Sequence, residues 1–377
     1  MYIQVQELVL MLSRAKDESD RNGFIEEFQN LDLNDDSDDS KKVEIYNKIF
    51  GQVKGLGVGT ANEIEGFFNL MGYLQLSLFK LSDNDGKLKY LELVDKVITD
   101  SNVEKQNLKY KVIKNLINNL NLNEGLRKDV YLKLLNEYSN KDELELMIDD
   151  EEAIVQYLSE WNISQNEKNG FLLDLIELLN KNELKGLSER YLITYLNQSE
   201  FNDQSRTMIK NLITSKLDDD KVLNFNDLFK IQCISNVKES EEFKLLEIVL
   251  NADEDKLNDY FKGSNEKVGL NYERLSTKLK LIKIKNYLND KVGKDLSYDD
   301  INKQINNKDY NQLENLLINL INLKLYNLKL NQINKVLYVN KKNFIDGDVI
   351  DFKLIEINLN QFKQDIFNLK KICNKTA

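Results

Sequence analysis

Leu296-Ser-Tyr-Asp-Asp-Ile-Asn-Lys-Gln-Ile305 begins the stretch of sequence that decides the fold class of this chain. Ser297 is suited to cap a helix, because its hydroxyl can accept a backbone N–H and acidic residues follow it in the first turn. A second helix is predicted by apolar residues three and four positions apart, and Leu328-Lys-Leu-Asn-Gln-Ile-Asn-Lys-Val-Leu-Tyr-Val339 then forms two β-type runs around an Asn-rich turn. Helix, helix and hairpin in this order predict a winged helix-turn-helix. The apolar residues of the second helix are Leu313, Leu316, Leu317, Leu320 and Ile321.

Upstream, residues 43–250 alternate apolar runs at helical spacing with short polar breaks rich in Asn, Asp and Gly. Helix follows helix at intervals of roughly 15 to 22 residues, which is typical of a solenoid of helix pairs. The sequence contains no Pro, so nothing interrupts the hydrogen-bond ladder of these helices. No repeat follows a fixed consensus, and we therefore expect a loose TPR- or HEAT-like array.

Downstream of Gly347, one last helix is predicted by an apolar seam spaced 3, 4, 3, 4, 3, 4, which is a heptad pattern. We expect this helix to bundle with helices of partner proteins; the alternative is that it folds back on its own chain. The seam consists of Phe352, Ile355, Leu359, Phe362, Ile366, Leu369 and Cys373.

These patterns predict a mostly α chain in four parts. We expect an N-terminal helical region with an acidic loop (residues 34–41) at 1–100, a helical-repeat solenoid at 101–290, a winged-helix module at 291–345 and a C-terminal bundle helix at 346–377.

Composition argues against an enzyme. The sequence contains no His, which excludes Ser-His-Asp and Cys-His catalysis within this chain, although carboxylate or lysine chemistry stays open. Two distant cysteines, Cys233 and Cys373, provide neither a disulfide framework nor a metal cluster. We therefore expect no catalytic residue, no cofactor and no metal.

No apolar run approaches the length of a membrane span and the start lacks a basic signal region, so we expect a cytoplasmic protein without membrane contact.

Charge is distributed unevenly over a chain of net charge −11. Residues 271–345 hold 14 basic and 7 acidic residues, residues 346–377 are balanced, and residues 1–270 therefore carry a net charge of −18. The basic segment is the only part expected to attract RNA phosphates, yet its second helix offers Asn at its polar positions and no Arg. Contact with acidic proteins is the preferred interpretation, and RNA contact is the alternative. The candidate RNA contacts are Lys324, Lys329, Lys335, Lys341 and Lys342.

Three motifs contain residues that could support binding or catalysis. Lys54-Gly-Leu-Gly-Val-Gly-Thr lacks the Gly-Lys-Ser/Thr of a phosphate-binding loop and is predicted to be a turn between helices. Asp83-Asn-Asp-Gly86 resembles a calcium loop, but Leu81 would occupy its first ligand position, so a helix start is expected. Trp161 is expected in the core.

Several segments resemble one known family when taken in order. Trp161-Asn precedes a Leu-rich helix at residues 171–179, Phe225-Asn-Asp-Leu-Phe-Lys-Ile leads toward the C-terminal module, and Tyr326-Asn-Leu-Lys begins the wing hairpin. In this order the segments resemble the PCI-domain proteins of the proteasome lid, the COP9 signalosome and translation initiation factor 3. Within that family they are most similar to the subunit M branch of the initiation factor, with subunit 7 of the COP9 signalosome a near relative.

The resemblance implies a non-catalytic scaffold in a hetero-oligomer. Its partners would be other initiation factor 3 subunits, of the PCI and MPN types, and the small ribosomal subunit. A PCI subunit of the COP9 signalosome or proteasome lid, or an RNA-binding PCI protein, is the alternative. We expect an exposed sheet edge at residues 336–339 to join a neighbouring wing and the last helix to join a shared bundle. The predicted interface residues are Leu337, Val339, Phe352, Ile355, Leu359, Phe362, Ile366 and Leu369.

Overall fold

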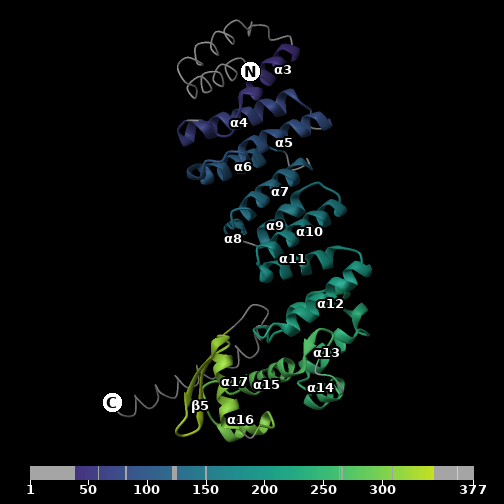
Figure 1. The fold of residues 1–377 in the computed structure, drawn as a ribbon, viewed down its shortest axis with the longest axis vertical. Coiled ribbons are helices and arrows are strands. Elements are labelled where there is room, and N and C mark those ends of the chain that lie inside the picture. Colours follow the sequence, from purple (N-terminus) through teal and green to yellow (C-terminus); the bar gives the residue numbers. More distant parts are fainter. Residues whose placement is uncertain are drawn as a thin grey trace, which may run out of the picture. The chain divides into compact units, whose positions relative to one another are not determined.

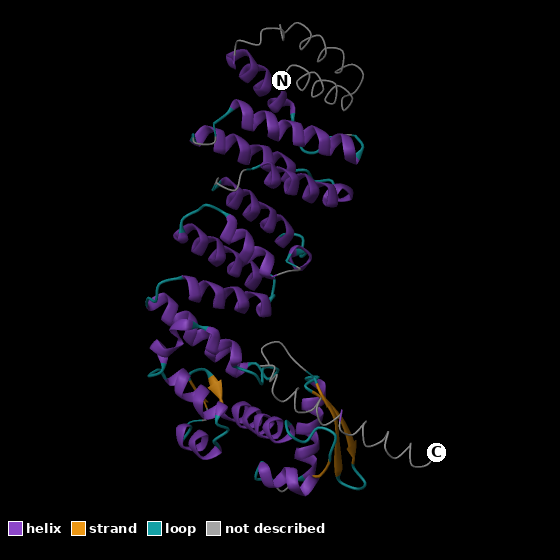
Figure 2. Cartoon of the chain, turned by 180° about the vertical axis from the view of Figure 1, so that it is seen from behind, coloured by secondary structure: helices purple, strands orange, loops and turns teal. Residues whose placement is uncertain are grey.

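A computed structural model describes residues 39–343, apart from residues 58, 81–82, 121–124, 149–150, 263, 265 and 308, together with Lys363. The described part is mostly helical with few strands, which confirms the predicted class (Figures 1 and 2). The chain divides into two compact units between Tyr195 and Leu196. None of its described helices is both long and apolar enough to cross a membrane. The four predicted domain boundaries stay a prediction.

The first unit is a succession of helices packed on their sequence neighbours. In Figure 1, α4, α5, α6 and α7 follow one another as stacked layers, and α7 also contacts α10. This arrangement agrees with the predicted helical array. The elements are α3 (Asp39–Gln52), α4 (Ala61–Leu78), α5 (Asn84–Ile98), η1 (Val103–Lys105), α6 (Gln106–Asn119), α7 (Leu126–Ser139), α8 (Leu144–Met147), α9 (Glu151–Glu160), α10 (Gln165–Lys181) and α11 (Lys185–Gln198), whose last residues enter the second unit.

Two helices of this unit begin with a reciprocal cap. At α4, the Glu63 N–H donates to the Thr60 hydroxyl and the Thr60 N–H donates to the Glu63 carboxylate. Ser164 and Glu167 form the same pair at α10, and these hydrogen bonds lower the pKa of the Glu167 carboxyl. Each box satisfies two backbone donors that a helix start leaves open.

The predicted loop at residues 34–41 is corrected at its C-terminal end, because α3 already begins at Asp39. Asp39, Ser40 and Lys41 are therefore helical residues. The rest of that segment lies outside the described residues.

Aromatic rings form the centre of the core at α7, α9 and α10. Trp161 is only 3% exposed, and its ring lies 5.8 Å from Tyr131 and 5.5 Å from Phe171 in edge-on contacts. Such contacts add to the stabilisation from burial alone. The expectation that Trp161 belongs to the core is confirmed.

One ion pair is buried in this core. Lys109 Nζ on α6 lies 3.0 Å from Glu137 Oε1 on α7, and both side chains are almost fully buried. The same ammonium donates to the Ile98 carbonyl, and Gln106 Nε2 donates to Glu137. The charges are thus surrounded by further polar partners, which a buried pair needs to offset its loss of water.

The second unit combines shorter helices with two small sheets. Its elements are α12 (Asp203–Asp218), η2 (Asn226–Lys230), η3 (Gln232–Val237), α13 (Glu241–Leu250), α14 (Glu254–Tyr260), β1 (Glu266–Lys267), β2 (Leu270–Asn271), α15 (Tyr272–Leu288), β3 (Asp295–Ser297), α16 (Tyr298–Gln304), α17 (Tyr310–Asn322), β4 (Tyr326–Asn331) and β5 (Val336–Lys342).

The larger sheet has the antiparallel order β3-β5-β4. Leu296 of β3 pairs with Leu337 of β5, and Leu328 of β4 pairs with Val339 after a register shift at Asn327. These paired side chains are buried, so one face of the sheet belongs to the core. The predicted hairpin is confirmed, whereas β3, a three-residue strand, was not predicted.

The prediction of an exposed sheet edge at residues 336–339 is wrong. β5 is the central strand, so its backbone groups are directed at β3 on one side and β4 on the other. Leu337 and Val339 are 0% and 1% exposed within this chain alone, so both side chains serve the core. The sequence pattern identified the strand but not its neighbours.

The buried Lys109–Glu137 pair makes the first unit sensitive to loss of one partner. We expect Lys109→Met to lower the free energy of unfolding by about 3–5 kcal/mol, because it strands a buried carboxylate. Adding Glu137→Leu should recover most of this loss. Urea unfolding followed by the fluorescence of Trp161, the sole Trp of the sequence, measures both.

The matched control is Lys48→Met, which removes an exposed ion pair with Glu44 and should cost under about 0.5 kcal/mol. Equal effects of the Lys109 and Lys48 substitutions would contradict this account.

Candidate interaction surface of the C-terminal unit

The predicted capping at the start of the C-terminal module is confirmed. The Ser297 hydroxyl accepts the Asp300 N–H and donates to the Asp300 carboxylate. Asp309 caps α17 in the same way by accepting the Asn311 N–H. The predicted apolar stripe of α17 faces inward: its four leucines are buried and Ile321 is half-buried.

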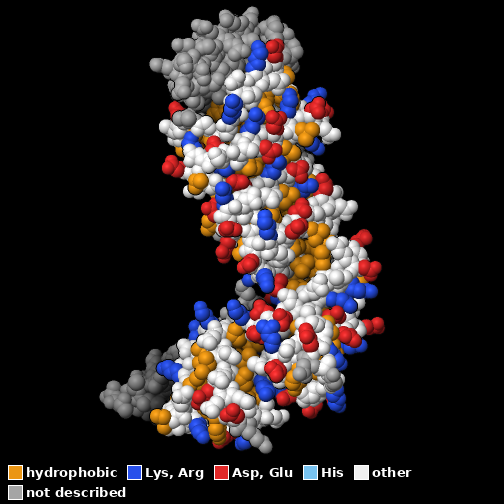
Figure 3. Space-filling view, viewed as in Figure 1, with side chains coloured by type: hydrophobic (Ala, Val, Ile, Leu, Met, Phe, Trp, Pro, Cys, Tyr) orange, Lys and Arg blue, Asp and Glu red, His pale blue; other side chains and the backbone are white. Residues whose placement is uncertain are grey.

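The hairpin spreads the five candidate RNA-contact lysines rather than gathering them. Lys335 lies at the turn, with Nζ 3.9 Å from the Tyr310 ring centroid, whereas Lys324 lies at the other end, just before β4. The strand between them extends roughly 20 Å. Four of the five are exposed, and Lys342 is half-buried. In Figure 3, basic side chains on the visible face of this module are scattered among uncharged, hydrophobic and acidic ones.

Other lysines of the basic segment are used inside the unit. Lys283 Nζ pairs with Glu254, and Lys285 Nζ donates to the Leu223 carbonyl. Lys278 is 2% exposed. Although Lys278 belongs to the basic segment that was expected to attract RNA phosphates, it is buried and cannot meet them, so part of the basic excess neutralises and caps neighbouring elements instead.

Lys278 joins α15 to the C-terminal end of α12. Its Nζ donates to the carbonyls of Lys216, Leu217 and Asp219 at 2.5, 3.1 and 2.7 Å. A helix leaves its last carbonyls without partners and carries partial negative charge there, so a cation is favoured. Burial nevertheless lowers the pKa of the Lys278 ammonium to about 8. The ammonium also lies 5.2 Å from the ring centroid of Phe225.

The sequence contains a signal for the buried position of Lys278. Lys278 follows Leu275 by three residues and precedes Ile282 by four, so it occupies the apolar stripe of α15. A lysine on a core stripe indicates a buried cation that needs acceptors from another element.

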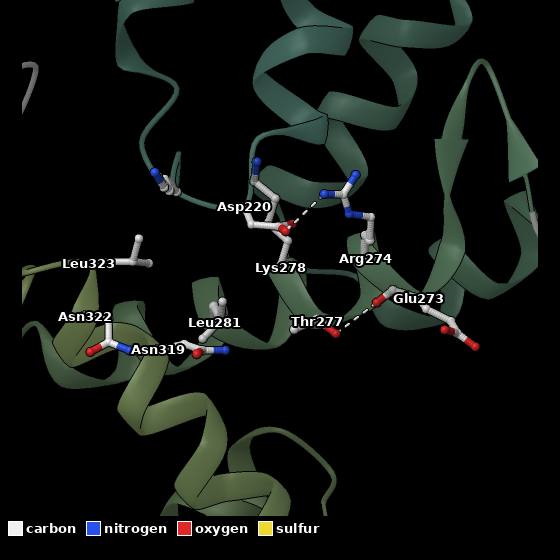
Figure 4. A pocket seen from close by; sticks show the side chains of 10 residues that line it. Asp220, Glu273, Arg274, Thr277, Lys278, Leu281, Asn319, Asn322 and Leu323 are labelled. Atoms are coloured by element: carbon white, nitrogen blue, oxygen red, sulfur yellow. Dashed lines mark hydrogen bonds and ion pairs between the residues drawn. The ribbon is translucent and has the colours of Figure 1, made fainter.

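A hollow of about 480 Å³ opens beside Lys278. Figure 4 shows Arg274 and Asp220 on one side of it, and Asn319 and Asn322 of α17 with the C-cap residue Leu323 on the other. Arg274 is engaged by Asp218 and Asp220, at 2.8 and 3.3 Å. The hollow is thus lined by amide and hydroxyl groups together with charged Lys221 and Glu273, next to an arginine that is paired with two aspartates.

The remaining motifs take the places expected of them. Residues 53–60 connect α3 and α4, with Gly55 and Gly57 at φ values of +76° and +69°, which side chains rarely adopt. The Leu56 N–H donates to Asp100 and is not directed at a phosphate. Asp83 is the N-cap residue of α5, so the calcium-like stretch is a helix start. Among the described residues, no cluster of His, Cys, Asp and Glu could hold a metal ion.

The predicted seam of the last helix lies outside the described residues. This applies to the six predicted interface residues Phe352, Ile355, Leu359, Phe362, Ile366 and Leu369, and to Cys373.

Part of the chain is similar to a known initiation factor subunit. A segment of 138 residues, 36% of this chain, is 30% identical to eukaryotic translation initiation factor 3 subunit M of Dictyostelium discoideum. The match covers 32% of that protein, so it spans about a third of the curated relative. No family model matches the chain. The resemblance to subunit M is thereby supported over about a third of the chain, and the assignment to the PCI family stays a prediction.

Because the pKa of Lys278 is lowered in the folded chain, the free energy of unfolding depends on pH. Between about pH 8 and the ordinary lysine value of 10.5, the unfolded chain keeps a proton that the folded chain has released. The free energy of unfolding of the wild type should therefore rise with pH in this window, relative to Lys278→Met, by at most about 1.4 kcal/mol per pH unit.

Hydrogen exchange of the α12 and α15 amides from pH 7 to 9.5, corrected for intrinsic exchange rates, measures this difference. Lys280→Met is the matched control, because Lys280 lies on the same helix and is only half-buried. The prediction would be contradicted if the free energy of unfolding of the wild type fell with rising pH relative to that of Lys278→Met.

Proposed function

We propose that this chain is a non-catalytic scaffold subunit of the translation initiation factor 3 complex, contributing to assembly of the pre-initiation complex on the small ribosomal subunit. The observation that carries this proposal is the 30% identity to subunit M over 138 residues. The expected neighbours are other subunits of that complex, in the cytoplasm. A place in the COP9 signalosome or proteasome lid is the alternative within the same family.

The element order supports this assignment. β3, α16, α17, β4 and β5 follow a helical array, with the last strand inserted between the first two in one sheet. We take this module to be the winged helix of a PCI domain. Its sheet packs on α16 through β3 and on α17 through β4, and buried apolar side chains lie on both strands, which suits a rigid element for joining subunits.

The central place of β5 changes where a neighbouring sheet could join. The outer side of β4 has no partner strand among the described residues, and β4 is twice as long as β3, with six residues against three. An unpaired strand edge can accept a strand from another protein through backbone hydrogen bonds. We therefore assign the sheet contact to β4, and the second contact to the seam of the last helix.

The proposal is tested by the proteins that copurify with the tagged chain from native lysate. We expect initiation factor 3 subunits and small ribosomal proteins. Replacing Leu359, Phe362 and Ile366 together by Asp should release the chain from the complex, because an isolated helix of this length is marginal without a surface to pack on. The midpoint of thermal unfolding of this variant, followed by the fluorescence of Trp161, should equal that of the wild type.

The matched control replaces Asn360, Gln364 and Asn368 by Asp, which adds the same charge off the seam. Retention of the seam variant at wild-type stoichiometry would contradict the bundle. Recovery of cullins or proteasome subunits in place of initiation factor subunits would contradict the proposed complex.

Direct RNA binding is the alternative that exposed Lys324, Lys329, Lys335 and Lys341 favour. Because these lysines are spread along the hairpin, we expect weak binding of the full chain to single-stranded RNA. The binding should fall steeply with salt and show no sequence preference. Fluorescence anisotropy with labelled oligonucleotides of several sequences measures it. Tight, sequence-selective binding that survives high salt would favour an RNA-binding protein over a scaffold.

A further inference from the structure

A second hollow, of about 330 Å³, lies within the first unit among α6, α7, α8 and α9. Its apolar wall includes Ile117, Met147, Tyr157 and Trp161. Tyr157 is 40% exposed, although its ring lies 6.1 Å from that of buried Tyr131. The volume is at the lower end of the range for ligand sites, so it fits one large side chain and its flanking backbone.

The charged residues that line this hollow are both basic. Lys114 on α6 and Arg127 on α7 contribute to it, and none of its described lining residues is acidic. This contrasts with a chain whose net charge is −11. Lys114 Nζ lies 5.7 Å from the ring centroid of Tyr138, so it is positioned by an aromatic face.

Arg127 is the residue of this hollow that is best suited to bind a carboxylate. It makes no ion pair or hydrogen bond within the described part of the chain and is half-buried. Its sequence neighbour Lys128, by contrast, pairs with Asp129 and Glu167. A guanidinium presents several donors in a fixed plane that matches a carboxylate. A half-buried guanidinium with no acceptor among the described residues, beside an apolar wall, is complementary to an apolar group that carries a carboxylate.

From this geometry we infer that the hollow at α6, α7 and α9 binds a short acidic segment of a partner protein, with a large apolar side chain on the Tyr157–Trp161 wall and a carboxylate on Arg127. This site is independent of the C-terminal contacts proposed above. It gives the helical array a recognition role of its own.

RNA fits this hollow less well. Of the aromatic side chains that line the hollow, Trp161 and Tyr131 are buried and only Tyr157 is exposed, so the hollow lacks the successive ring faces on which a single strand stacks its bases. Two cations are fewer than the phosphate contacts on which nucleic-acid affinity usually rests, and the net charge of the chain repels a polyanion.

Trp161 lines the hollow and is the sole Trp of the sequence, so its fluorescence reports binding at this place. The probe is the acetylated and amidated peptide Gly-Asp-Phe-Asp-Gly, titrated into the full chain. We expect a saturable change that is lost when Ala replaces Phe or when Asn replaces both Asp residues of the peptide. Arg127→Gln should weaken binding about tenfold or more, because a charge-assisted hydrogen bond is lost.

The matched control is Lys128→Gln, which removes the same charge one residue away and should leave the affinity unchanged. Thermal unfolding of both variants checks that the unit remains folded. The inference is overturned if the peptide gives no saturable change up to millimolar concentration, if both substitutions weaken binding equally, or if a single-stranded oligouridylate binds more tightly than the peptide and displaces it.

Discussion

The buried ammonium of Lys278 is the interaction on which the second unit depends. It satisfies three carbonyls at the end of α12 and so fixes α15 against that helix. α15 in turn contacts α13, α14, α16 and α17, so the small sheet and its helices are positioned through it. A charge held in this way is costly to bury, and the three acceptors together with the nearby carboxylates of Asp219, Asp220 and Asp218 offset only part of that cost, so the pKa of the ammonium stays lowered.

Helices and the hairpin could be predicted because their patterns are local. The spacing of Leu313, Leu316, Leu317 and Leu320 defines one buried face, and the alternating residues of β4 and β5 define two strands. Ser297 and Asp309 act as helix caps through contacts only two or three residues long. Such features need no knowledge of the rest of the chain.

The order of strands could not be predicted, because it depends on contacts between distant residues. β3 has three residues and only Leu296 is buried, which is too little for an alternation pattern. Its pairing with β5 joins residues about 40 positions apart, and this pairing turned an expected edge into a central strand. The role of Lys278 was missed for a related reason, since its acceptors lie some 60 residues earlier. A count of charges cannot distinguish a lysine on the surface from one that caps a helix.

The central position of β5 also has a consequence for synthesis. β5 is the last strand that the structure describes, and both β3 and β4 pair with it and with no other described strand. While the chain is being made, neither can join a sheet until residue 342 has left the ribosome, so the module closes late. A chain that stops within the hairpin turn would carry two strands with both edges open, the arrangement that leads most readily to aggregation. Premature termination within the hairpin turn should therefore be harmful, although it leaves the sequence of the first unit intact.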